Sequence, residues 1–390
     1  MTLTPTDQFI LSSVKINPTP ADLERLNNLI PQIEDWDDLA KTAIDRGIGP
    51  LIFKKMPLLS SASMIPEPVK QKLQGAYYRT LSRSIVLYDA FRKVAEALTA
   101  HSIKVVALKG IYLSEWLYKD IGLRQFSDID LLVQKEDGEK CLEILEVLGY
   151  KSSGDEVSDM ISDRAGIIHY PPMVLNEVSV EIHIDLHHKR KNYQINVAEF
   201  IRCALPVTIN KVEVHTLQLY DLLIQLCIHL DKHFVQGDMQ FTCFNDITNL
   251  LDVYAREIDW NAFSIRCSES KCEETVFKYL LLINKYFFAP ISETVCKKYS
   301  YLLIEKDENL FVNYLHGYVG TSYGASTHLQ NIRQIRGFRN KTHYLLLVVF
   351  PTKEFMVKAY QIKTQSLYWL HYPYRHWIGI KGLLKTGKNK

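Results

Sequence analysis

Two aspartates, Asp128 and Asp130, stand two positions apart at the start of the segment 127–133. Side chains alternate along a β-strand, so this spacing places both carboxylates on one face, roughly 7 Å apart at about 3.3 Å per residue. A solvated strand edge is one interpretation of such a pair. The apolar residues 131–133 that follow instead indicate a strand buried on both faces. Two repelling carboxylates at the end of a buried strand favour a divalent cation, above all Mg²⁺.

A third acid, Glu181, lies in the segment 178–187, where polar and apolar residues alternate. This alternation predicts a strand with one dry face and one polar face. Glu181 belongs to the polar face, where it can join Asp128 and Asp130. The three carboxylates together form a candidate metal triad.

Histidines offer other metal sites. His183 and His187, with Asp185 between them, share the polar face of the predicted strand and could bind zinc, but two-residue steps spread them over too long a span for one ion. His229 and His233 lie four positions apart, so they share one helical face at metal-ligand spacing. No Glu follows the first of them, as a metalloprotease motif requires. A polar pocket face or a structural pair is therefore the favoured interpretation of this pair.

Several motifs together resemble the bacterial family known as uncharacterised nucleotidyltransferases, within the DNA polymerase beta-like nucleotidyltransferase superfamily. A glycine turn after a strand, an Asp-x-Asp on a second strand and one acid on a later strand form the shared pattern. The matching residues are Leu108-Lys109-Gly110, Leu117-Tyr118-Lys119-Asp120, Gly122, Arg124, Ser127 to Val133, and Val180-Glu181-Ile182-His183. The resemblance covers about residues 35–360. It is strongest at the metal motifs and weaker in the flanks, where it includes Trp36, His229, His233, Asp246 and Trp260.

The resemblance implies an α+β fold: a polymerase beta-like core, made of a small mixed sheet with helices on one side, flanked by helical regions. It implies a Mg²⁺- or Mn²⁺-dependent nucleotidyltransferase that moves a nucleoside monophosphate from a nucleoside triphosphate, such as ATP, to an unknown acceptor. Asp128, Asp130 and Glu181 would be the catalytic metal ligands, with Glu181 either a direct ligand or the base. His183, His229 and His233 would line the acceptor site.

The phosphate site departs from the superfamily pattern. A Gly-Gly or Gly-Ser pair is usual there, whereas Ile111 follows Gly110 and offers no hydroxyl. The resemblance then gives phosphate binding to Lys109 as a compact cation and to Gly110, which permits close backbone approach. Ile111 would open a helix whose N-terminus favours anions.

Arg124 and Ser127, close to the aspartates, complete the phosphate-binding set that the resemblance implies. The guanidinium of Arg124 suits bidentate contacts with phosphate oxygens. A salt bridge from Arg124 to Asp120 or Asp128 is an equal alternative.

Four regions are expected along the chain: an N-terminal helical region (1–103), the nucleotidyltransferase core (104–215), a helical domain (216–330) and a basic aromatic C-terminal region (331–390). Thr19 and Pro20 predict a helix start, and Gly47 predicts the stop of a second helix. The expected core strands lie at Val105, Ile129, Val180 and near Ile167. Further helices are expected over 35–46, 67–100, around 114 and 139, and over 218–230, 244–254, 260–266 and 273–288.

Composition fits a globular protein with a sizeable core. The chain has 390 residues, 47% of them hydrophobic, and seven cysteines without a C-x-x-C pair, so zinc ribbons and disulfides are not expected. A reducing cytoplasm is the expected location. The opening residues do not resemble a signal peptide, and the longest apolar run, 344–350, is too short to cross a membrane.

Charge is uneven along the chain. Residues 331–390 hold twelve Lys and Arg against one acid, Glu354, a net charge of +11, which leaves −9 for the first 330 residues. Arg333, Arg336 and Arg339 would form one helical stripe, and aromatic residues alternate with basic ones over 368–377. Such a tail suits RNA, an anionic membrane surface, or the acidic remainder of the chain itself.

Two further functions compete with the enzyme. One is a catalytically silent module of the same fold that binds a nucleotide or a partner. The other is an RNA-binding protein that acts through its basic tail. Sequence leaves the acceptor and the preferred base undetermined, because this fold serves many acceptors through its loops.

Overall fold

The computed structural model describes residues 3–153, 169–186, 193–236, 240–316 and 365–377, together with residues 342, 345, 346, 349, 350, 353 and 356. The helices of eight or more residues are α1 (Pro5–Ser12), α2 (Pro20–Leu29), α3 (Trp36–Asp45), α5 (Glu67–Ala100), α6 (Lys109–Trp116), α7 (Gly138–Val147), α10 (Leu219–Gln236), α11 (Phe241–Tyr254), α12 (Trp260–Glu269), α13 (Glu273–Phe287) and α15 (Glu305–Leu315). Shorter helices are α4 (Gly49–Lys55), α9 (Val197–Arg202) and α14 (Glu293–Tyr299). The strands are β1 (Val106–Ala107), β2 (Asp128–Leu132), β3 (Lys151–Ser152), β4 (Met173–Leu175), β5 (Val178–His183), β6 (Leu205–Ile209) and β7 (Val212–Thr216).

One mixed sheet carries the candidate site. Its strand order is β3-β4-β5-β2-β1-β7-β6. Strand β2 lies inside the sheet, antiparallel to β1 and parallel to β5, in a register that sets Asp130 opposite Glu181. An interior strand leaves no free edge, and Asp130 is buried. The solvated strand edge considered for this aspartate is therefore wrong.

The sheet is larger than the sequence indicated. Among the described residues it has seven strands instead of the small sheet expected, because the hairpin of β6 and β7 joins β1 through the parallel pairing of β7. Asn210 and Lys211 form the turn of this hairpin with φ values of 44° and 69°, the conformation that tight hairpin turns require. The strand expected near Ile167 lies outside the described residues, and β5 ends at His183 rather than continuing to His187.

Helix α2 begins, and helix α3 ends, at the residues that the sequence predicted. Thr19 caps α2 in a capping box with Asp22, and Pro20 occupies the first helical position. Helix α3 starts after its cap Asp35 and is followed by Gly47 with a φ of 72°. These sequence predictions are confirmed.

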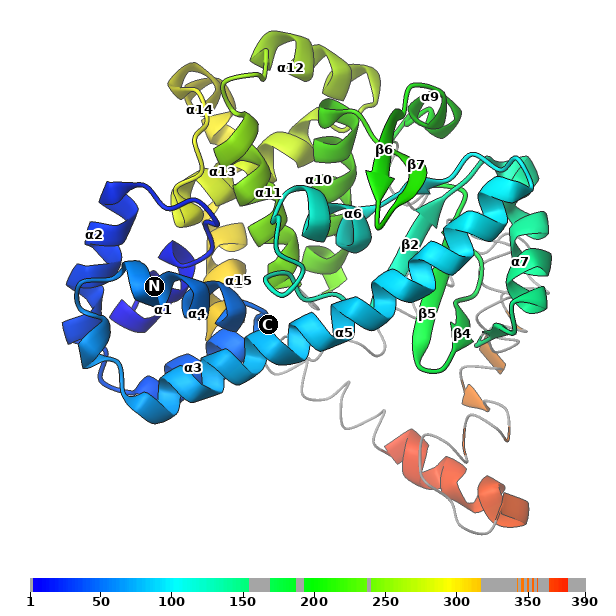
Figure 1. Ribbon diagram of the computed structural model, residues 1–390, viewed down its shortest axis with the longest axis horizontal. Coiled ribbons are helices and arrows are strands. Elements are labelled where there is room, and N and C mark those ends of the chain that lie inside the picture. Colours follow the sequence, from blue (N-terminus) through cyan, green and yellow to red (C-terminus); the bar gives the residue numbers. More distant parts are fainter. Residues whose placement is uncertain are drawn as a thin grey trace.

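Helix α5 links the N-terminal helices to the sheet. It is a single helix of 34 residues, about 50 Å long at 1.5 Å per residue. It packs against α3 and α4, and it also contacts β2, β5 and β7. Figure 1 shows it crossing the molecule diagonally, with α6 and α7 beside the sheet.

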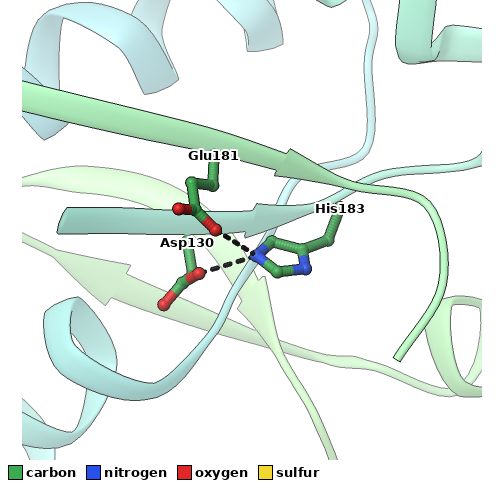
Figure 2. Close-up of side chains that lie close together, drawn as sticks. All are labelled: Asp130, Glu181 and His183. Carbon is green, nitrogen blue, oxygen red and sulfur yellow. Dashed lines mark hydrogen bonds and ion pairs between the residues drawn. The ribbon is translucent and has the colours of Figure 1, made fainter. Parts of the chain in front are cut away.

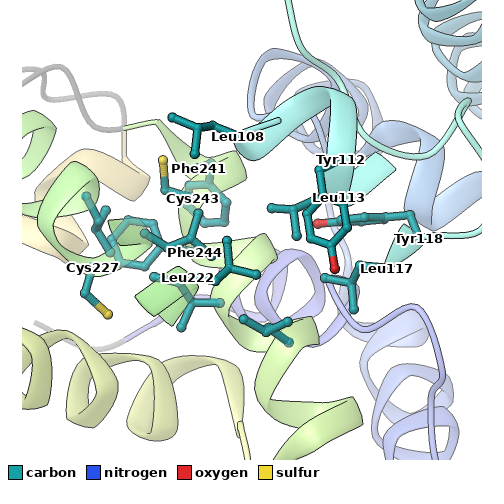
Figure 3. Packing of buried hydrophobic residues seen from close by; sticks show 14 of the residues in the cluster. Leu108, Tyr112, Leu113, Leu117, Tyr118, Leu222, Cys227, Phe241, Cys243 and Phe244 are labelled. Atoms are coloured by element: carbon teal, nitrogen blue, oxygen red, sulfur yellow. The ribbon is translucent and has the colours of Figure 1, made fainter. Parts of the chain in front are cut away.

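The chain after the sheet forms a helical layer in which α10 packs on α11, α12 and α13. Figure 3 shows part of the core, in which Tyr112 and Leu113 of α6 belong to the same buried cluster as Leu222 of α10 and Phe244 of α11. Buried apolar side chains form one cluster that runs from Phe9 to Leu315. The expected division at residues 103, 215 and 330 stays a prediction.

The basic aromatic region is described only in part. Arg333, Arg336 and Arg339 lie outside the described residues. The described segment 365–377 is helical, and Trp369 and Trp377 are each more than half exposed. Among the described residues, no helix is long and apolar enough to span a membrane.

Candidate metal and nucleotide site

Three of the candidate residues meet where β2 and β5 run side by side. Asp130 projects from β2, while Glu181 and His183 project from β5 (Figure 2). Nε2 of His183 lies 2.6 Å from Oδ1 of Asp130 and 3.5 Å from Oε2 of Glu181. One ligand atom from each residue falls within 4.8 Å of the others, a spacing compatible with one metal ion.

Lys109 supplies a cation to this cluster. Its Nζ lies 3.1 Å from Oδ2 of Asp130, at the start of α6. Burial by itself would raise the pKa of Asp130, but the charge of Lys109 and the hydrogen bond with His183 outweigh burial and hold that pKa well below its usual range. Burial would likewise lower the pKa of His183, yet its bonds with Asp130 and Glu181 raise it.

Asp128 stands apart from these three ligands. It is half-buried, two residues before Asp130 on the same strand. Burial, reinforced by the charge of Asp130, raises the pKa of Asp128 to about 6. Of the three candidate carboxylates, Asp128 therefore has the charge that is least compensated by its neighbours. A bound cation would stabilise that charge.

Gly110 and Ser127 have structural partners of their own. A Cβ at Gly110 would lie 2.8 Å from the ring of Phe126, so close packing accounts for this glycine without any phosphate. Ser127 is exposed, and its carbonyl accepts a hydrogen bond from Arg83 at 3.1 Å.

Arg124 pairs with a residue far along the chain. Its Nε and Nη2 donate to the two carboxylate oxygens of Asp246 at 2.8 Å and 2.6 Å, and both side chains are buried. The salt bridge considered from sequence, to Asp120 or Asp128, is therefore wrong in its partner. Asp120 pairs with Lys54 at 2.8 Å instead.

All ten candidate residues line one cleft of about 610 Å³. The ten are Lys109, Gly110, Arg124, Ser127, Asp128, Asp130, Glu181, His183, His229 and His233. The sheet forms one wall, and α10 and the first turn of α11 form another. Residues from the end of α3 and from α15 also reach it, including Arg46 and Tyr314.

His229 and His233 face this cleft from α10, with ring centroids 4.5 Å apart in an edge-to-face arrangement. Burial, and next the charge of Lys109, holds the pKa of His229 well below its usual range. His229 is therefore neutral at pH 7 and able to accept or donate a hydrogen bond. Within the described part of the chain, neither histidine belongs to a metal-ligand group of three.

The donor chemistry fits a hard divalent cation. Asp130 and Glu181 offer carboxylate oxygens at bonding range of a common point, and Asp128 adds a third carboxylate to the same cleft. Mg²⁺ and Mn²⁺ prefer such oxygens, while the imidazole of His183 suits Mn²⁺ better than Mg²⁺. Asp185 is absent from the metal-ligand group found among the described residues, and His187 lies outside them.

Some residues of the cleft were not predicted as site residues. Asp246 appeared only in the order of flanking motifs, although a buried arginine must have an acidic partner. His169, whose Nδ1 is 3.9 Å from Oε2 of Glu181, also lines the cleft. Arg46 and the first turn of α11 carry no local signal of a site.

A family comparison agrees with this geometry. The model of a family described as uncharacterised nucleotidyltransferase matches residues 32–288 of the chain. That range contains every residue that lines the cleft except Tyr314. No curated protein matches the chain.

Proposed function

The chain belongs to the uncharacterised nucleotidyltransferase family, and from that premise we propose that it moves a nucleoside monophosphate from a nucleoside triphosphate to an acceptor hydroxyl or phosphate. One observation carries the proposal. Asp130, Glu181 and His183 gather within bonding range of a common point, beside Asp128 and Lys109, in a cleft large enough for a nucleotide. The sheet around this cluster would be a polymerase beta-like core.

The carboxylates would hold the metal. Asp128, Asp130 and Glu181 are the proposed ligands for Mg²⁺ or Mn²⁺. Bound metal would neutralise phosphate charge and lower the pKa of the acceptor hydroxyl. Glu181 serves either as a ligand or as the base that receives the acceptor proton.

Lys109 would exchange partners during binding. Its Nζ now lies 3.1 Å from Asp130, and a phosphate oxygen can replace that carboxylate as its acceptor. The acceptor oxygen then forms a bond to the α-phosphorus, the bond to the β-phosphate oxygen breaks, and pyrophosphate leaves. His183, His229 and His233 line the cleft and would contact the acceptor. The protein would act in the cytoplasm.

The test is nucleotide transfer by the full chain. We expect labelled nucleotide to pass from one of the four nucleoside triphosphates to a member of a broad acceptor panel, with Mg²⁺ or Mn²⁺ present. Asp130→Asn should lower the rate about 100-fold or more, because one charged metal ligand is lost. Glu136→Gln changes an exposed acid just beyond β2 and is the matched control.

A catalytically silent module of the same fold is the competing function. It predicts metal-dependent binding of a nucleoside triphosphate without transfer to any acceptor of the panel. Absence of both binding and transfer would exclude the enzyme and the silent nucleotide-binding module together.

A further inference from the structure

The first turn of α11 opens onto the same cleft as the metal cluster. Gln240, Phe241, Thr242 and Cys243 all line the cleft. Gln240 precedes the helix with φ −94° and ψ 112°, and no side chain caps the turn. The first N–H groups of a helix lack the usual acceptor four residues earlier, and they carry about half a positive charge. The N–H of Cys243 donates to the carbonyl of Gln240 at 3.1 Å, and the N–H groups of Phe241 and Thr242 have no acceptor among the described residues. This turn is thus able to bind an anion.

Arg124 provides a second and independent sign of a ligand. Its side chain is only 6% exposed, and Asp246 occupies Nε and Nη2. Nη1 is buried, and among the residues that the structure describes it has no hydrogen-bond partner. A buried donor left unpaired is costly, and Arg124 lines the cleft. An anion in the cleft would supply the missing acceptor.

Asp246 fixes Arg124 against α11. Besides the two bonds from Arg124, Asp246 accepts a hydrogen bond from the hydroxyl of Tyr118 at 3.0 Å. Both oxygens of Asp246 are therefore occupied. Because Asp246 lies on α11, its two bonds hold the guanidinium of Arg124 against the helix whose first turn lines the cleft.

Arg124 and the first turn of α11 line the same cleft as the start of α6. Leu108, the residue before α6, lines the same cleft as Phe241 and Cys243, and Figure 3 labels all three side chains. Burial raises the pKa of the Cys243 thiol to about 12, while the positive charges of Lys109 and Arg124 lower that pKa. The first turns of α6 and α11 thus border the same part of the cleft.

We propose that the first turn of α11, together with Arg124, binds the β- and γ-phosphates of the donor nucleotide. This inference rests on the proposed function. The turn at Gly110 offers no hydroxyl, because Ile111 follows this glycine. Thr242, the second residue of α11, offers a hydroxyl and an N–H that has no acceptor among the described residues. The donor phosphates would thereby be held by the first turn of α11 and by Arg124, which lies between α6 and β2.

The experiment removes one N–H from the turn of the full chain. Thr242→Pro deletes the amide of the second helical position, and proline is tolerated in a first helical turn. Thr242→Ala keeps the amide and removes only the hydroxyl, so it is the matched control. Binding of ATP, AMP and inorganic pyrophosphate is measured by calorimetry with Mg²⁺, and thermal unfolding verifies that each variant folds.

We expect Thr242→Pro to bind ATP and pyrophosphate roughly 10- to 100-fold more weakly, the effect of one lost hydrogen bond to a charged group. AMP binding should be unchanged, since AMP has neither a β- nor a γ-phosphate. Arg124→Lys should show the same pattern, because lysine keeps the charge and loses the fork. Mn²⁺ affinity, followed by electron paramagnetic resonance, should stay at the wild-type value in Thr242→Pro.

Equal affinity of Thr242→Pro and wild type for pyrophosphate and ATP would overturn the inference. So would a wild-type protein that binds neither ligand. If wild type binds pyrophosphate in a manner that depends on Thr242 but transfers no nucleotide, the phosphate site stands and the proposed transfer fails. If it transfers nucleotide at the same rate and affinity in Thr242→Pro, the transfer stands and the phosphate site fails.

Discussion

Asp128 and Asp130 have the same side chain and lie on the same strand, yet their surroundings give them opposite properties. Asp130 is buried beside Lys109 and His183, which favour its charged form. Burial and the neighbouring Asp130 disfavour the charged form of Asp128. A metal-free protein at pH 7 therefore carries an unfavourable charge at Asp128.

The pH dependence of stability follows from this difference. The pKa of Asp128 is about 6 in the folded protein, above its ordinary value of 3.8. Its stabilising effect is thus fully present below pH 3.8 and is lost as the pH rises through 6. We expect Asp128→Asn, which cannot ionise, to raise the free energy of unfolding at pH 7.5 by about 1–3 kcal/mol, with a smaller gain at pH 4.5.

Urea unfolding with a chelator, at both pH values, measures this effect. Glu136→Gln is the control, since it removes an exposed charge. A gain for Asp128→Asn that is equal at the two pH values would contradict the assignment of the raised pKa to Asp128.

At the scale of elements, the first two residues of α6 have different roles: Gly110 packs against Phe126, and Lys109 pairs with Asp130. Gly110 faces Phe126 so closely that a Cβ would lie 2.8 Å from the ring. Lys109, just before it, has a φ of 42°, which costs free energy for a residue with a side chain. The same turn thus places Lys109 beside Asp130 and packs Gly110 against Phe126.

Two glycine substitutions separate packing from helix propensity. We expect Gly110→Ala to destabilise the protein by about 1–3 kcal/mol, because the methyl group overlaps Phe126. Gly75→Ala, within α5, meets only the flexible end of Arg79 at 3.2 Å, and it should stabilise by about 0.5–1 kcal/mol.

Urea unfolding of both variants tests the pair. A double-mutant cycle with Phe126→Ala isolates the overlap: Gly110→Ala should cost less in the Phe126→Ala background, because Cγ and Cδ2 of Phe126 are then absent and only its Cβ, 2.9 Å away, remains. A Gly110→Ala protein as stable as wild type would show that Phe126 moves aside without cost.

At the scale of the whole molecule, the cleft is lined both by the N-terminal region, through Arg46, and by α15, through Tyr314. The guanidinium of Arg46 lies 3.9 Å above the ring of Tyr314 and donates to its carbonyl. His316 lies 2.9 Å from Asp7. These contacts hold α15 against the N-terminal helices, so the helical regions are part of the site.

The basic tail is the other feature at this scale. Its net charge of +11 contrasts with −9 for the rest of the chain, and the described segment 365–377 exposes Trp369 and Trp377. We expect the full chain to bind tRNA or anionic vesicles at low salt, with affinity that falls steeply as salt rises.

Replacing Lys381, Lys385, Lys388 and Lys390 with glutamate should abolish that binding, and replacing them with arginine should preserve it. Binding of tRNA alone or of vesicles alone identifies the class of partner. If neither binds at low salt, the tail instead contacts the acidic body of its own chain.

Sequence by itself determined the strands that carry Asp130 and Glu181, the cap of α2, the stop of α3 before Gly47, and the family resemblance that the comparison confirms. These features depend on residue order over a few positions, where alternation and capping act. Only the tertiary structure decided that Arg124 pairs with Asp246, 122 residues away.

The composition of the cleft was likewise decided only by the tertiary structure. Side chains of β2, β5, α10 and α11 meet there, and no local pattern in the sequence specifies how those elements approach one another. Their approach is set by burial of one continuous apolar cluster from Phe9 to Leu315, a property of the whole chain. Sequence thus determined which residues are suited to bind metal and phosphate, and packing of the core decided which of them meet.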